Sequence, residues 1–143
     1  MIFNINNKTE STLWQFFKFG FVGITGLILG IAIINISMHI RENFVIANLI
    51  SFPIAVTWNY ALNRTFTFKQ ETNRSIITQW LMFIVSSIFG TIANWSVSFG
   101  LYYNILVFEK HYNLAVLFGV ATGCVFNFII SKYIVFKPIY QKD

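Results

Sequence analysis

Long apolar stretches separated by short polar ones run through most of this chain. They predict four membrane-spanning helices, at about residues 16–38, 44–64, 80–106 and 113–136, because about 20 apolar residues in a helix cross the hydrocarbon core. None of the stretches alternates with the period of two that barrel strands show, and none has the polar face of a soluble bundle helix. The pattern therefore predicts an all-α integral membrane protein.

The second half of the chain resembles the first. Equivalent positions near the start of each half are 64 residues apart: Gln15 and Gln79, Phe19 and Phe83, Gly26 and Gly90. Equivalent positions near the end of each half are 68 residues apart: Asn59 and Asn127, Arg64 and Lys132, Phe68 and Phe136. We expect a four-helix bundle of two helical hairpins that repeat in parallel, related by an axis along the membrane normal. This membrane domain would span residues 15–137, between a polar segment at 1–14 and a tail at 138–143.

Composition and charge support the membrane assignment and orient the chain. The sequence is 56% hydrophobic and only 10% charged, with a mean hydropathy of +0.64, and this is too little charge to cover a soluble surface. Eight basic residues lie at the termini, in the middle connection or at the adjoining helix ends: Lys8, Lys18, Arg64, Lys69, Arg74, Lys132, Lys137 and Lys142. Only Arg41 and Lys110 lie on the other side. The bias predicts cytoplasmic termini, and the net charge of +5 favours anionic lipids as partners over nucleic acid.

The expected spans contain few side chains that could act in catalysis. All five acidic residues lie outside the expected helices, so general acid–base catalysis and proton coupling lack a buried carboxylate. His39 and His111 have no neighbours at metal-ligand spacing, and the one cysteine, Cys124, lies in an apolar run. We therefore expect a protein that is not an enzyme, with no catalytic residues, no metal site and no cofactor. A small-molecule exporter coupled to protons is disfavoured for the same reason.

Each even-numbered span ends in a ladder of polar residues. The first ladder is Asn59, Asn63 and Arg64, and the second is Asn127, Ser131 and Lys132. Asn94 adds an amide in the third span. Three interpretations are open: the amides bond between helices while the cations reach lipid phosphates, or the ladders line a pathway for a polar head group, or they bind a partner's membrane segment.

The endings also resemble those of a known family. Asn59-Tyr60-Ala61-Leu62-Asn63-Arg64-Thr65-Phe66-Thr67-Phe68 and Asn127-Phe128-Ile129-Ile130-Ser131-Lys132-Tyr133-Ile134-Val135-Phe136 follow an aromatic-rich opening, Gln15-Phe16-Phe17-Lys18-Phe19. Together they resemble the GtrA-like family of small four-span membrane proteins over about residues 15–137. The residue two before the terminal Phe is often a large aromatic in that family. It is Phe66 in the first copy and Ile134 in the second, so we expect the second copy to be the more structural one.

The resemblance implies translocation of a polyprenyl-phosphate-linked monosaccharide, typically undecaprenyl-phosphate glucose, across the bacterial cytoplasmic membrane. That lipid serves glycosylation of surface polysaccharide or teichoic acid, with membrane glycosyltransferases of the same pathway as partners. On this basis we expect Lys18, Arg64 and Lys132 to bind the phosphate. The amides Asn59, Asn63, Asn94 and Asn127, with Ser131, would offer hydrogen bonds to the sugar and line the polar pathway.

Two further expectations concern assembly. A bundle of this size leaves little room for a closed cavity, which favours a homo-oligomer. The alternative function is an accessory subunit that stabilises or localises a membrane glycosyltransferase and transports nothing.

Overall fold

A computed structural model describes residues 10–41, 43–69 and 74–137. The described residues are helical, with no strand among them, and this confirms the all-α prediction for that part of the chain. Residues 1–9 of the expected N-terminal segment and the whole expected tail at 138–143 lie outside the described part, and so do Lys8 and Lys142.

The helices follow one another as α1 (Thr12–Arg41), α2 (Phe44–Leu62), the π-helix η1 (Asn63–Phe68), α3 (Ile76–Asn104), α4 (Leu106–Lys110), α5 (Tyr112–Ile130) and the π-helix η2 (Ser131–Val135). Side-chain caps begin two of them. Asn43 accepts a hydrogen bond from the Ile46 amide at the start of α2, and Ser75 accepts one from Thr78 at the start of α3.

Among the described residues, three helical segments are long and apolar enough to cross a membrane: Thr12–Ile40, Ile76–Asn104 and Tyr112–Val135. The chain is thus a membrane protein by the length and composition of these helices. The expected second span, α2, is a helix of 19 residues that packs along α1 but does not belong to this set. It contains Pro53 and the amides of Asn48 and Asn59.

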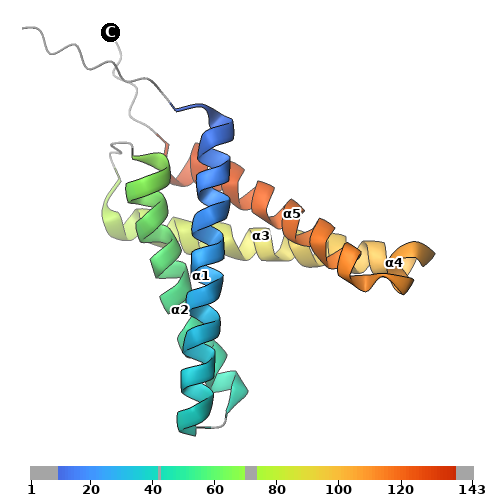
Figure 1. The fold of residues 1–143 in the computed structure, drawn as a ribbon. Helices are drawn as coiled ribbons and strands as arrows, with labels where there is room; N and C mark the ends of the chain where they lie inside the picture. Colours follow the sequence, from blue (N-terminus) through green and yellow to red (C-terminus); the bar gives the residue numbers. More distant parts are fainter. Residues whose placement is uncertain (1–9, 42, 70–73, 138–143) are drawn as a thin grey trace, which may run out of the picture.

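The helices pair as two hairpins, α1 with α2 and α3 with α5. Figure 1 shows that the hairpins meet at one end and point away from each other beyond it. We call the meeting region, residues 10–19, 60–69, 74–83 and 128–137, the joined end. The expected four-helix bundle is present only there. Elsewhere each hairpin exposes an apolar surface, which lipid tails solvate as well as another helix would.

Six aromatic rings form the core of the joined end: Phe19, Tyr60, Phe68, Phe83, Phe128 and Phe136. The ring centroids of Phe68 and Phe136 lie 4.6 Å apart with an interplanar angle of 18°, so the terminal Phe of each repeat stacks on that of the other. Offset stacks and edge-to-face contacts of this kind contribute about 0.5–1.5 kcal/mol per pair beyond burial. The joint is therefore made by residues that the repeat duplicates.

The ring contacts come in equivalent pairs. Phe19 of the first repeat lies 5.7 Å from Phe128 of the second. The equivalent pair, Phe83 and Tyr60, is separated by 5.8 Å. Because each hairpin contacts the other through the same positions, the two are related by an approximate twofold axis that passes between Phe68 and Phe136.

The π-helices explain the spacing of the duplicated ending. Their backbone hydrogen bonds join residues five apart: Lys69 donates to the Arg64 carbonyl at 3.2 Å, and Phe136 donates to the Ser131 carbonyl at 2.7 Å. Side chains five apart thereby share one face, so Asn63 and Phe68 are both buried at the joint. The equivalent residues, Ser131 and Phe136, are buried in the same way.

Candidate functional site

The amides of the two ladders lie in the seams within the hairpins. Asn59 of α2 packs against Gly26 of α1, and a Cβ added at Gly26 would overlap its carboxamide. Asn127 of α5 packs against Gly90 of α3 in the same way. Both Oδ1 atoms are buried without a hydrogen-bond partner among the described residues. The glycines therefore admit the amides into the helix–helix contact, and the amides retain unused acceptors there.

The other amides are also packed between helices. Asn63 is 1% exposed, donates to the Asn59 carbonyl at 2.9 Å and accepts from the Thr67 hydroxyl at 2.8 Å. Asn94 accepts from Ser98 at 3.2 Å and lies against Gly119 of α5. Ser131 is fully buried, and its hydroxyl lacks a partner in the described part. Of the residues predicted to contact the sugar, Asn59, Asn94 and Asn127 thus lie in the seams within the two hairpins, whereas Asn63 and Ser131 lie buried at the joint.

Arg64 joins the two hairpins. Its Nη1 donates to the Tyr60 hydroxyl at 3.0 Å and makes a short hydrogen bond to Gln79 Oε1 on α3. The Tyr60 hydroxyl also lies 3.0 Å from Gln79 Oε1. Gln79 is 1% exposed, and its Nε2 donates to the Val135 carbonyl at 3.2 Å. Arg64 is therefore held in a polar network that crosses the joint.

Lys132 occupies the position of Arg64 in the second repeat, but its partners differ. Its ammonium donates to the Thr12 hydroxyl at 2.6 Å, at the first residue of α1. It also lies over the rings of Phe128 and Tyr133, at 5.9 Å and 5.6 Å from their centroids. No carboxylate of the described residues pairs with it.

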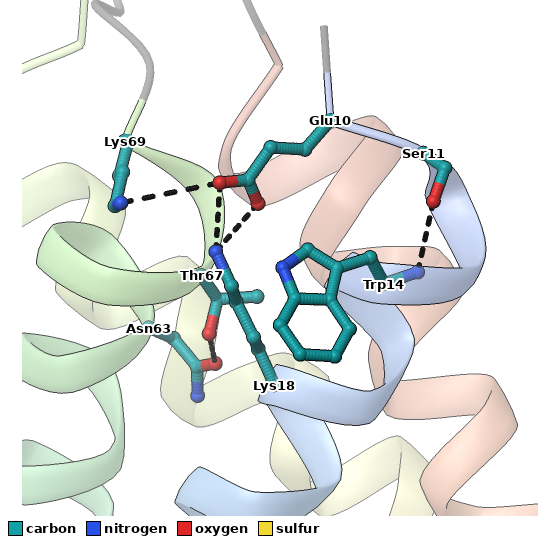
Figure 2. Close-up of polar contacts among 7 residues, drawn as sticks. All are labelled: Glu10, Ser11, Trp14, Lys18, Asn63, Thr67 and Lys69. Carbon is teal, nitrogen blue, oxygen red and sulfur yellow. Dashed lines mark hydrogen bonds and ion pairs between the residues drawn. The ribbon is translucent and has the colours of Figure 1, made fainter.

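Lys18 pairs with an anion in this region. Its side chain is 8% exposed although it lies on a membrane-length helix. The ammonium contacts both carboxylate oxygens of Glu10, at 2.7 Å and 2.6 Å (Figure 2). Lys69 approaches the same carboxylate from η1, with its ammonium 3.9 Å from Oε1. Two lysines from different helices therefore face one carboxylate.

Aromatic rings and buried polar groups surround this pair. The Lys18 ammonium lies 5.1 Å from the Phe66 centroid and 5.7 Å from the Trp14 centroid. Phe66 also faces Lys69, at 5.9 Å. Cation–π contacts of this kind favour the charged lysines without neutralising them. Figure 2 shows the hydrogen-bonded pair Thr67 and Asn63 beside Lys18. We call Glu10, Trp14, Lys18, Phe66 and Lys69 the lysine clamp.

The second repeat has no such clamp. The positions equivalent to Glu10, Trp14, Lys18 and Phe66 are occupied by Arg74, Thr78, Met82 and Ile134, and only Lys69 has a like residue, Lys137. Met82 is partly buried and packs on the aromatic core. The same scaffold thus folds around an apolar side chain at the position of Lys18, so the clamp is a chemical feature of the first repeat.

The lysine clamp contains one residue that the sequence had singled out, Lys18, together with residues that it had not. The sequence pattern predicted Lys18, Arg64 and Lys132 as one phosphate site, but the structure gives each a different set of partners. It missed Glu10, Trp14 and Lys69 as members of a site. The contrast between Phe66 and Ile134 at equivalent positions was the available signal for the clamp. Among the described residues, no group of three or more His, Cys, Asp and Glu side chains could hold a metal ion.

Comparison with known proteins shows that this chain matches a protein family. The GtrA/DPMS transmembrane domain matches residues 18–140. A dolichol-phosphate mannosyltransferase of Pyrococcus furiosus is 23% identical over 127 residues, which cover 89% of this chain and 35% of that protein. The chain thus spans about a third of the length of that relative. Because the family match extends over most of the sequence, this chain belongs to the GtrA/DPMS transmembrane domain family.

Proposed function

We propose that this protein moves a polyprenyl-phosphate-linked monosaccharide, such as undecaprenyl-phosphate glucose, across the bacterial cytoplasmic membrane. The product would serve glycosylation of surface polysaccharide or teichoic acid. Family membership supports a role with polyprenyl-phosphate sugars, and the relative is named for dolichol phosphate. The protein itself would catalyse no reaction.

The buried ammonium of Lys18 is the observation that carries this proposal. A cation in a membrane-length helix is expensive to bury and is by default a candidate functional group. Its present partner is a carboxylate, whose two oxygens resemble the two free oxygens of a phosphodiester. An anionic lipid head group is therefore a chemically suitable ligand.

The proposed topology has four spans, with α2 as the fourth beside α1. The described ends of the chain and the residues that flank the middle connection, Lys69 and Arg74, belong to the joined end, as do Lys18 and Arg64. Positive charge of this kind marks the cytoplasmic side. The clamp would then face the leaflet in which the sugar lipid is made.

The transport step needs only the head group to cross. The polyprenyl tail remains in lipid, whereas each unsatisfied polar group of the sugar costs several kcal/mol in hydrocarbon. The buried acceptors of Asn59 and Asn127 would become available to the sugar when the helices of a hairpin separate. Transport would be downhill, driven by use of the lipid on the outer side.

The test is a transport assay with purified full-length protein in proteoliposomes. Labelled polyprenyl-phosphate glucose in the inner leaflet should become accessible to an external enzyme with wild-type protein, and several-fold more slowly with Lys18→Met. Lys110→Met, at the far end of the second hairpin, removes the same charge and serves as the control. Equal rates with empty liposomes would reject translocation.

A second function is favoured by one observation. The chain matches only 35% of the length of a protein named as a mannosyltransferase, so this type of domain also occurs within a longer chain. The protein would then dock and stabilise a separate glycosyltransferase. Co-purification with that enzyme and a rise in its activity, without any lipid transport, would support this alternative.

A further inference from the structure

We propose that Glu10 is a displaceable internal anion that occupies the lysine clamp until the phosphodiester of the sugar lipid replaces it. The inference rests on the proposed function, because it identifies the group that the clamp binds. It adds that the chain carries its own competitor for that ligand, and that Lys69, Trp14 and Phe66 belong to the site.

The geometry of the clamp matches a monoanion with two oxygens. Both Glu10 oxygens contact Lys18, and Oε1 also faces Lys69 at 3.9 Å. A phosphodiester likewise carries one negative charge over two free oxygens, so exchange with Glu10 leaves the charge of the site unchanged. Lys18, at 8% exposed, would then keep an anionic partner in both states.

Glu10 is placed so that it can leave without breaking a helix. It precedes α1, which begins at Thr12, and its side chain is 33% exposed. Lys18 and Lys69, in contrast, are fixed on α1 and at the end of η1. Movement of Glu10 would open the clamp toward the joined end while the two lysines stay in place.

Two observations indicate that the clamp serves ligand binding more than folding. The second repeat forms the same joint with Met82 at the position of Lys18 and Ile134 at that of Phe66. In addition, Lys69 has a φ of 45°, in the left-handed region that favours glycine or asparagine. The clamp accounts for a lysine in that conformation, because its ammonium faces the Glu10 carboxylate.

Competition from Glu10 would also help a carrier to release its lipid. A ligand that must displace a bound carboxylate binds with an apparent affinity reduced by the fraction of time that the site is open. Return of Glu10 would then help to release the head group from the two lysines. The clamp thereby captures the lipid without retaining it.

The experiment measures binding of radiolabelled dihexyl phosphate, a phosphodiester without a sugar, to full-length protein in phosphatidylcholine nanodiscs, with protein-free discs as the blank. Glu10→Gln removes the competing charge and should tighten binding about tenfold if the clamp is closed about nine-tenths of the time. Glu109→Gln, in α4 far from the clamp, makes the same charge change and should leave binding unchanged. Lys18→Met should abolish specific binding, both alone and combined with Glu10→Gln.

Two competitors identify the source of the phosphodiester. Farnesyl phosphoglucose should displace the probe more effectively than phosphatidylglycerol does, and the reverse order would overturn the assignment to the sugar lipid. Equal binding by Glu10→Gln and Glu109→Gln would overturn the role of Glu10. The transport assay tests the proposed function separately. If the protein transports the lipid but Glu10→Gln leaves probe binding unchanged, this inference alone is rejected. If Glu10→Gln tightens probe binding but the protein transports no lipid, translocation is rejected and the role of Glu10 as a displaceable anion stands.

Discussion

Phe68 and Phe136, the last aromatic residues of the two repeats, stack on each other where the hairpins meet, with their ring centroids 4.6 Å apart. Each is at most 3% exposed. The hairpins also meet through the hydrogen bonds of Arg64 and Tyr60 to Gln79, so the stack, its neighbouring rings and this polar network together join them.

Replacing one ring of this stack should loosen the joint. Phe136→Leu keeps an apolar side chain but removes the ring contacts, and we expect it to lower the free energy of unfolding by about 1 kcal/mol. Phe126→Leu, at a position 49% exposed toward lipid, should have little effect. Unfolding in mixed micelles, followed by circular dichroism, measures the difference. Equal effects at both positions would show that the stack does not stabilise the joint.

The glycines opposite the seam amides should tolerate no side chain. An alanine Cβ at Gly26 or Gly90 would overlap Asn59 or Asn127, so each Gly→Ala change should destabilise its hairpin by about 1–3 kcal/mol. Gly23→Ala is the control, because an added Cβ there meets nothing within 4 Å.

The same measurement in the Asn59→Ala background separates packing from helix propensity. Most of the cost of Gly26→Ala should disappear once the amide is gone. A cost that persists would mean that the overlap is not its cause.

The approximate twofold axis predicts a stabilising substitution. Gln79 Oε1 accepts a hydrogen bond from the Tyr60 hydroxyl, whereas the equivalent Gln15 Oε1 is buried without a described partner. In the second repeat the position of Tyr60 is occupied by Phe128, which has no hydroxyl. Phe128→Tyr should supply the missing donor and raise the free energy of unfolding by about 1 kcal/mol. Tyr60→Phe should lower it by a similar amount.

A Gln15→Leu background distinguishes the new hydrogen bond from a general effect of tyrosine. The gain from Phe128→Tyr should vanish there, because the acceptor is absent. If the gain remains, the two repeats are not equivalent at this contact.

Arg64 and Lys18, two basic residues of the joined end, should differ in function: Arg64 stabilises the fold, and Lys18 binds the anion. Arg64→Met removes a donor from a buried network and should destabilise the fold by about 1–3 kcal/mol. Lys18→Met introduces the residue that the second repeat has at the same position, so it should leave stability nearly unchanged while anion binding is lost. Parallel measurements of unfolding and dihexyl phosphate binding on both variants test this division. Similar losses of stability would indicate that Lys18 is as structural as Arg64.

The sequence predicted several features for physical reasons that require no coordinates. Membrane helices follow from the length of apolar runs, and two equivalent hairpins follow from recurrence of Gly26 and Asn59 as Gly90 and Asn127. The duplicated Asn and Phe positions indicated a shared role, and the structure shows what each position does. The Asn packs on a glycine, and the Phe forms the joint.

What the sequence alone determined about this protein is its class: hydrophobic length, the internal repeat and the motif are local properties of the chain, and they led to a helical membrane protein of the GtrA/DPMS transmembrane domain family. The tertiary structure decided which charges meet. Arg64 and Lys18 look alike along the sequence, but Arg64 faces Gln79 of the other hairpin and Lys18 faces Glu10. These contacts depend on how the helices cross and on where Glu10, which precedes α1, places its side chain. The spacing of residues within one helix encodes neither.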